Sequence, residues 1–131
     1  MKKEEIKTGQ APAAIGPYSQ GVRAGDLIFV SGQIPIDPAT GNAVAGGIVA
    51  ETRQVLENLK AVLEEAGAGL KDVVKTTVYL SDLARFNEMN TVYGEFFSRP
   101  FPARATVGVS ALPKGVGVEI DAVAVVGNKV K

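Results

Sequence analysis

The apolar residues between positions 49 and 66 recur at intervals of three and four, which is the spacing of one face of an α-helix. This face would carry Val55, Leu56, Leu59, Val62, Leu63 and Ala66. Gly67 follows the last of them, and a glycine at that point is typical of a helix end. We therefore expect a helix over residues 49–66.

A second run with helical spacing begins after Ser81 or Asp82, either of which could cap a helix N-terminus. Pro100 ends the run, because the residue before a proline is disfavoured in helical conformation. The buried face would carry Phe86, Met89, Tyr93, Phe96 and Phe97. The pattern predicts a second amphipathic helix.

Other apolar stretches are short and rich in β-branched residues, which is typical of strands. They are residues 19–23 (SQGVR), 27–32 (LIFVSG), 73–80 (VVKTTVYL), 103–110 (ARATVGVS) and 116–126 (VGVEIDAVAVV). The first two flank a turn at Gly25 and Asp26, and the last two flank the turn segment ALPKG. Each of these pairs predicts a β-hairpin.

Two helices and one mixed sheet predict an α+β fold, with both helices packed on one face of the sheet, in a single domain over residues 1–131. The second face must then be solvated or covered by another subunit. Val123 and Val125 alternate with Ala122 and Ala124, so the last strand has apolar side chains on both faces. This favours coverage by another subunit.

The charge balance argues against nucleic acid as a partner. Fourteen Lys and Arg residues equal fourteen Asp and Glu residues, and the sequence pI is about 6.3, so no excess positive field exists to hold a phosphate backbone. No apolar run approaches the roughly 20 residues of a membrane helix. We expect a soluble, cytoplasmic protein with no membrane partner.

Cysteine and histidine are both absent. Their absence removes disulfides, thiolate nucleophiles, the usual zinc ligand sets and the residue most often used for proton transfer near neutral pH. Chemistry here would have to use carboxylates, hydroxyls, arginine, lysine, the backbone and water.

Arg104 lies inside a predicted strand, where an unpaired cation is costly to bury. Strand alternation places Thr106 and Gly108 on the same face. If the second hairpin centres on residues 112–115, Gly108 lies opposite Glu119, and Thr106 lies opposite Asp121. Arg104 would then converge with both carboxylates, although a shift of one residue would reverse the face of Glu119.

Two interpretations of Arg104 stay open at this point. It could form a structural salt bridge to Asp121 or Glu119, or its planar guanidinium could bind the carboxylate of a ligand.

The segment PARATVGVSALPKGVGVEI resembles the signature of the reactive intermediate deaminase (RidA, also called YjgF) family. APAAIGPYSQG, VSGQIP, VVKTTVYLSDL and MNTVYGEFF resemble the family at the matching places, so the similarity runs nearly end to end. The resemblance implies a chorismate-mutase-like fold and a homotrimer with ligand clefts between subunits. It also implies hydrolysis of enamines or imines such as 2-aminoacrylate to a 2-keto acid and ammonia.

The resemblance assigns roles to two residues. It implies that Arg104 holds the substrate carboxylate and that Glu119 positions or activates the attacking water. Further cleft residues would be Tyr18, Ser31, Gly32 and Asn90. Each of these has an ordinary alternative: Tyr18 could cap the edge of the core, Ser31 and Gly32 could be turn residues, and Asn90 could be a solvent-facing amide.

Thr106 stands where many relatives carry cysteine, two residues after the motif arginine. Its hydroxyl could still bind a ligand, but a thiol-based step is excluded.

Imine hydrolysis suits the residues available, because it requires only an oriented water, a proton shift and loss of ammonia. No metal or cofactor is needed. We expect Arg104 to lower the pKa of Glu119, so that the carboxylate is ionised at neutral pH and orients water.

Three competing functions are a non-catalytic binding protein for small 2-keto or 2-amino acids, a ribonuclease or translation inhibitor, and a chaperone-like protein. In the first of these, Arg104 would be needed and Glu119 would be dispensable.

Overall fold

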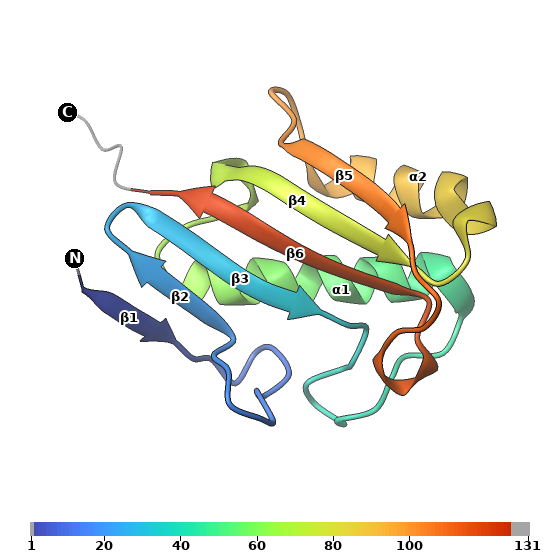
Figure 1. The fold of residues 1–131 in the computed structure, drawn as a ribbon, viewed down its shortest axis with the longest axis horizontal. Coiled ribbons are helices and arrows are strands. Elements are labelled where there is room, and N and C mark those ends of the chain that lie inside the picture. Colours follow the sequence, from blue (N-terminus) through green and yellow to red (C-terminus); the bar gives the residue numbers. More distant parts are fainter. Residues whose placement is uncertain (1, 127–131) are drawn as a thin grey trace.

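A computed structural model describes residues 2–126 (Figure 1). Its strands are β1 (Lys3–Ile6), β2 (Gly21–Ala24), β3 (Leu27–Gln33), β4 (Val73–Leu80), β5 (Ala103–Gly108) and β6 (Val118–Val125). The helices are α1 (Gly47–Glu65) and α2 (Phe86–Phe96). Short 3-10 turns lie at Leu70–Asp72, Leu83–Arg85 and Pro113–Gly115. Both helices lie on the same face of one sheet, as the sequence predicts.

The sheet has the strand order β1-β2-β3-β6-β4-β5. All neighbours are antiparallel except β4 and β5, which are parallel. The predicted hairpin of residues 19–32 is confirmed as β2 and β3. β1 was not predicted, because its KEEI sequence is mostly polar; it pairs as the edge strand beside β2.

The predicted hairpin of residues 103–126 is wrong. β4 lies between β5 and β6 and pairs with both. The linker of residues 109–117 passes the end of β4, where the Val109 amide donates to the Leu80 carbonyl at 2.9 Å and the Ser81 amide donates to the Gly117 carbonyl at 3.1 Å. The predicted pairing of Thr106 with Asp121 and of Gly108 with Glu119 therefore does not form.

The core lies between the sheet and the two helices. The predicted apolar face of α1 is confirmed, and its Val55, Leu56, Leu59, Val62 and Leu63 are fully buried. They pack with helix-facing side chains of the central strands, which include Ile28, Val30, Val78, Leu80, Val118, Ile120, Ala122 and Ala124. The alternating strand pattern thus buries one face of the sheet against α1.

The ends of the helices follow local chemistry. Gly67 follows α1 with φ +82°, a left-handed conformation that glycine adopts without strain. Asp82 accepts a hydrogen bond from the Ala84 amide at 3.0 Å, so it caps the 3-10 turn before α2 and not α2 itself, which begins at Phe86.

Within residues 2–126 no helix covers the opposite face of the sheet. Leu27, Phe29, Val107 and Val125 are 40%, 43%, 40% and 37% exposed. We call this surface the open face. It matches the second sheet face that the sequence predicts to be wet or covered by another subunit.

Candidate active site

β5 places Arg104 on the helix side of the sheet. In the parallel register Arg104 lies beside Thr76, Thr106 beside Val78 and Gly108 beside Leu80. These three residues of β4 are buried against the helices. The predicted shared face of Arg104, Thr106 and Gly108 is therefore confirmed.

The Arg104 guanidinium lies over aromatic rings of α2. Its central carbon is 4.6 Å from the ring centroid of Tyr93 and 5.6 Å from that of Phe86. The Tyr93 hydroxyl is 2.7 Å from the Thr76 hydroxyl, which fixes the ring. Burial raises the pKa of Tyr93, partly offset by the Thr76 hydrogen bond and by the positive charge of Arg104. Such stacking stabilises a cation without neutralising it.

Within residues 2–126 Arg104 has no salt-bridge partner. The structural salt bridge to Asp121 or Glu119 is thus wrong for the single chain. A cleft of about 420 Å³ opens beside the guanidinium. Its lining residues are Asn90, Tyr93, Gly94, Phe101, Pro102 and Arg104. Asn90 is therefore placed with Arg104, whereas Thr106 is half-buried on the same strand face outside this lining.

Glu119 lies on the open face of β6, beside Tyr79 of β4. The neighbouring strand β3 has a bulge between Val30 and Gln33. Gly32 in this bulge leaves room for the Glu119 carboxylate, because a Cβ at position 32 would clash with that group. The Ser31 hydroxyl donates to the Ser19 carbonyl at 2.6 Å and so ties the bulge to the loop that carries Tyr18.

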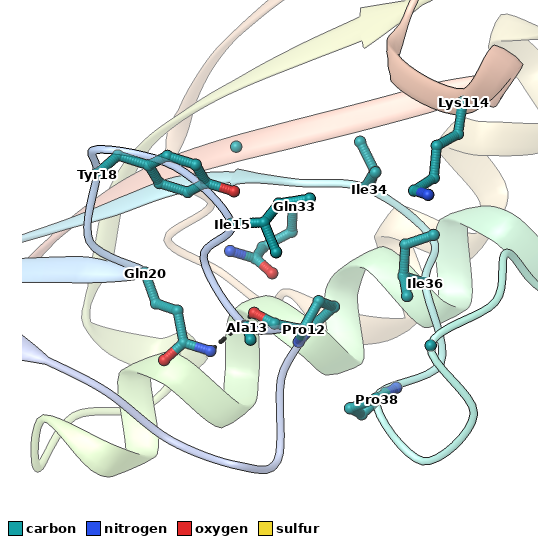
Figure 2. Close-up of a pocket in the computed structure, with 12 residues that line it drawn as sticks. Pro12, Ala13, Ile15, Tyr18, Gln20, Gln33, Ile34, Ile36, Pro38 and Lys114 are labelled. Atoms are coloured by element: carbon teal, nitrogen blue, oxygen red, sulfur yellow. Dashed lines mark hydrogen bonds between the residues drawn. The ribbon is translucent and has the colours of Figure 1, made fainter.

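Tyr18 and Gly32 line a cavity of about 330 Å³ between the loop before β2 and the loop after β3. Figure 2 shows Tyr18 toward one end of this cavity, and Ile34, Ile36 and Lys114 toward the other. The remaining lining residues are Pro12, Ala13, Ile15, Gln20, Gln33, Pro38 and Gly41. Of these lining residues, only Tyr18 and Gly32 are predicted as site residues from the sequence. The apolar wall is formed by two loops, and no sequence pattern indicates that these loops lie side by side.

Gln20 shapes that wall through its buried carboxamide. Its nitrogen donates to the carbonyls of Thr8, Ala11 and Pro12, at 3.0, 3.3 and 2.8 Å, and its oxygen accepts from the Thr8 amide at 2.7 Å. One side chain thus holds the loop that leads to Tyr18 (Figure 2).

Burial raises the pKa of Glu119, and the negative charge of Asp121 raises it further. The Tyr79 hydroxyl donates to Asp121 Oδ2 at 3.0 Å. The pKa of Tyr79 is also raised, by burial first and then by Asp121 and Glu119. The predicted lowering of the Glu119 pKa by Arg104 is wrong for the single chain, because the two side chains lie on opposite faces of the sheet.

The predicted site residues, together with Tyr93, which the sequence predicts only as part of a buried helix face, form two groups. The arginine group consists of Arg104, Asn90 and Tyr93, on the helix side at β5 and α2. The glutamate group consists of Glu119, Gly32, Ser31 and Tyr18, around the bulge of β3 and the adjoining loop. The expected convergence of Arg104 with Glu119 and Asp121 does not occur within one chain, since β4 separates their strands.

The chemistry of the two groups is complementary. The arginine group offers a cation for an acid, and the glutamate group offers a carboxylate of raised pKa that can accept a proton from water. Between residues 2 and 126 no three acidic side chains gather in a way that could hold a metal ion. In the same part of the chain, no helix combines the length and apolar character needed to cross a membrane.

Comparison with known proteins gives matches along nearly the whole chain. The profile of the family described as Endoribonuclease L-PSP matches residues 8–126. A RutC family protein of Pyrococcus abyssi is 58% identical over 124 residues, covering 95% of this chain and 98% of that protein. The human 2-iminobutanoate/2-iminopropanoate deaminase is 49% identical over 122 residues, covering 93% of this chain and 89% of the human protein.

Two solved structures share the fold. RidA from an Antarctic Psychrobacter species has a TM-score of 0.91 and 46% identity, covering 94% of this chain and 99% of that one. TdcF of Escherichia coli, solved with bound serine, has a TM-score of 0.90 and 44% identity, covering 95% and 99%.

Proposed function

The chain belongs to the RidA family, and on that premise we propose that it is an imine deaminase, which hydrolyses 2-imino acids and their enamine tautomers to 2-keto acids and ammonia. Three mammalian relatives that are 47–51% identical to this chain carry the name 2-iminobutanoate/2-iminopropanoate deaminase. The observation that carries the proposal is Arg104, a cation stacked on Tyr93 with no acidic partner among the described residues and with a cleft beside it.

The active site would be completed by a second copy of the chain. The arginine group and the glutamate group lie on opposite faces of one sheet, so one chain cannot present both to a small substrate. Contact between copies would bring the arginine group of one chain to the glutamate group of the next, and the open face supplies apolar surface for that contact. We propose a homotrimer with such shared sites.

In the proposed mechanism Arg104 binds the substrate carboxylate through its planar guanidinium, and Asn90 adds an amide beside it. Glu119 accepts a proton from water as the water oxygen bonds to the imine carbon. Glu119 passes this proton to the nitrogen, which gives a neutral carbinolamine. Glu119 then takes the proton of the carbinolamine hydroxyl and transfers it to the nitrogen as the C–N bond breaks, so that the carbonyl forms and ammonia leaves. An enamine such as 2-aminoacrylate first gains a proton on its terminal carbon and loses one from its nitrogen, which gives the imine.

The remaining predicted residues would shape the site. Gly32 leaves room for the Glu119 carboxylate, and Ser31 fixes the bulge. Tyr18 would cover the entrance of the adjoining cavity, whose apolar wall suits the substrate side chain. Thr106 stands where a thiol occurs in many relatives, so the mechanism uses no sulfur.

A coupled assay tests this function. Imines would be generated from several amino acids by an oxidase or a dehydratase, and their decay compared with wild type and with Arg104→Ala. Loss of the carboxylate anchor should lower kcat/KM roughly a hundredfold or more. Equal decay of the imines with both proteins would remove the catalytic proposal.

A binding protein without turnover is the second candidate, favoured by the serine bound in TdcF. A comparison of wild type with Glu119→Gln separates the two functions. A deaminase should hydrolyse imines as wild type and lose this activity in the variant, whereas a binding protein should leave hydrolysis at the uncatalysed rate in both. Affinity for 2-keto acids should be kept by the variant in either case. The family description names an endoribonuclease, but the zero net charge argues against RNA binding. An RNA titration without salt-dependent affinity would exclude that activity.

A further inference from the structure

The residue before β6 is held from both sides by hydrogen bonds. The Gly117 amide donates to Glu51 Oε1 at 2.8 Å, and the Gly117 carbonyl accepts from the Ser81 amide at 3.1 Å. Glu51 comes from the first part of α1, whose N-terminal end lies near the start of β6 in Figure 1. Gly117 is therefore anchored both to the helix layer and to the end of β4.

This anchor lies beside the first part of β6, which is paired with one neighbouring strand only. On the β4 side the pairing of β6 begins at Val118, opposite Leu80, and continues with Glu119 opposite Tyr79. On the β3 side it begins only at Ile120, opposite Gln33. The segment that carries Glu119 thus has a ladder on one side only, and the Glu51 bond supplies a second constraint two residues away.

Glycine at position 117 leaves room for the hydrogen bond to Glu51. A Cβ at position 117 would lie 2.9 Å from Glu51 Oε1 and 3.4 Å from Ile48 Cδ1, so only glycine lets the carboxylate reach the amide undisturbed. Glu51 is half-buried and forms no salt bridge within residues 2–126. A carboxylate that accepts from a backbone amide forms a stronger bond than a neutral acceptor does.

We propose that Glu51 is a positioning residue for the reaction: by holding Gly117, it fixes the start of β6 and thereby the place of the Glu119 carboxylate against Gly32. This inference rests on the proposed function, because it assigns Glu119 the contact with the reacting water. Glu51 itself touches no substrate. A displacement of about 1 Å at a catalytic group can lower a rate by as much as a hundredfold.

The test compares Glu51→Ala, Glu51→Gln and the control Glu57→Ala, which removes an exposed glutamate from the same helix. We would measure kcat and KM for 2-iminopropanoate, the melting temperature, and hydrogen exchange of the Gly117 amide. In Glu51→Ala the amide should exchange faster and kcat should fall roughly tenfold, while KM changes less than about twofold because Arg104 is untouched. Glu51→Gln keeps an acceptor and should restore most of kcat, and Glu57→Ala should match wild type.

Gly117→Ala provides a second route to the same answer. Its methyl group should displace the Glu51 carboxylate and lower kcat in the wild-type background, and it should add little in the Glu51→Ala background. Additive losses in the double variant would contradict the inference.

An unchanged kcat in Glu51→Ala would overturn this inference alone, as would an equal loss in Glu51→Gln. A wild-type protein without imine hydrolysis would overturn the proposed function and this inference together.

Discussion

The environment of Arg104 shows how a half-buried cation can be stabilised without an acidic partner among residues 2–126. The ring of Tyr93 lies against the guanidinium, and the Thr76 hydroxyl holds that ring in place. Strand alternation predicts that Arg104 shares a face with Thr106 and Gly108, but not that this face is turned toward the helices. The stacking partner was not predictable, because it depends on α2 packing beneath β5.

If Glu119 is the base of the proposed reaction, the charge of Asp121 should help to determine the pH below which activity is lost. Glu119 would have to be ionised to accept a proton, so activity should rise as pH increases through its pKa. Burial and the Asp121 charge raise that pKa above the ordinary value of 4.5. Asp121→Asn removes one of the two causes and should move the acidic limb of the kcat/KM profile to lower pH.

The matched control for that experiment is Asp26→Asn, which neutralises an exposed carboxylate in the turn between β2 and β3. Its pH profile should coincide with that of wild type. An acidic limb that stays in place in Asp121→Asn would show that the two carboxylates are not coupled.

At the scale of the elements, the bulge in β3 determines where the Glu119 carboxylate can lie. The pairing of β3 with β6 shifts between Val30 and Gln33, and Gly32 in that shift faces Glu119. Gly32→Ala would drive a methyl group into the carboxylate. We expect kcat to fall at least about tenfold, since the proposed general base, Glu119, would be displaced.

Gly9→Ala is the control for this substitution, because a Cβ at position 9 meets no atom within 4 Å. It should leave both kcat and the melting temperature nearly unchanged. Full activity in Gly32→Ala would show that Glu119 tolerates another position.

The elements also show what sequence patterns can and cannot predict. Periodicity predicts α1, α2 and the hairpin of β2 and β3, because these follow from contacts between residues near in sequence. It fails for β5 and β6, since their apolar patterns are equally compatible with direct pairing and with the insertion of β4. The same limit applies to the candidate site: the resemblance to a family predicts Arg104 and Glu119 as site residues, but only the strand registers show that the two side chains lie on opposite faces of the sheet.

At the scale of the whole molecule, the two groups make a distinctive prediction about mixed assemblies. In the proposed mechanism Arg104→Ala lacks the substrate anchor and Glu119→Gln lacks the base, so each protein alone should be inactive. Co-refolded in equal amounts, they should regain about a quarter of wild-type activity, because a random mixture places an intact arginine group against an intact glutamate group in that share of sites.

The measurement needs proof that the chains have exchanged. Mass spectrometry of the intact assembly should show mixed species, and a mixture combined without refolding should remain inactive. Mixed species without recovered activity would contradict a site shared between chains.

The proposed division of the site between the two faces of the sheet also has a kinetic consequence. A newly synthesised monomer would carry both the arginine group and the glutamate group, but it would be inactive until it assembles with other copies of the chain. After dilution or during refolding, turnover should then begin with a lag that shortens as the protein concentration rises. The rate at which activity appears should depend on protein concentration with an apparent order above one. The onset of activity would report subunit encounter, well after each chain has acquired its own structure.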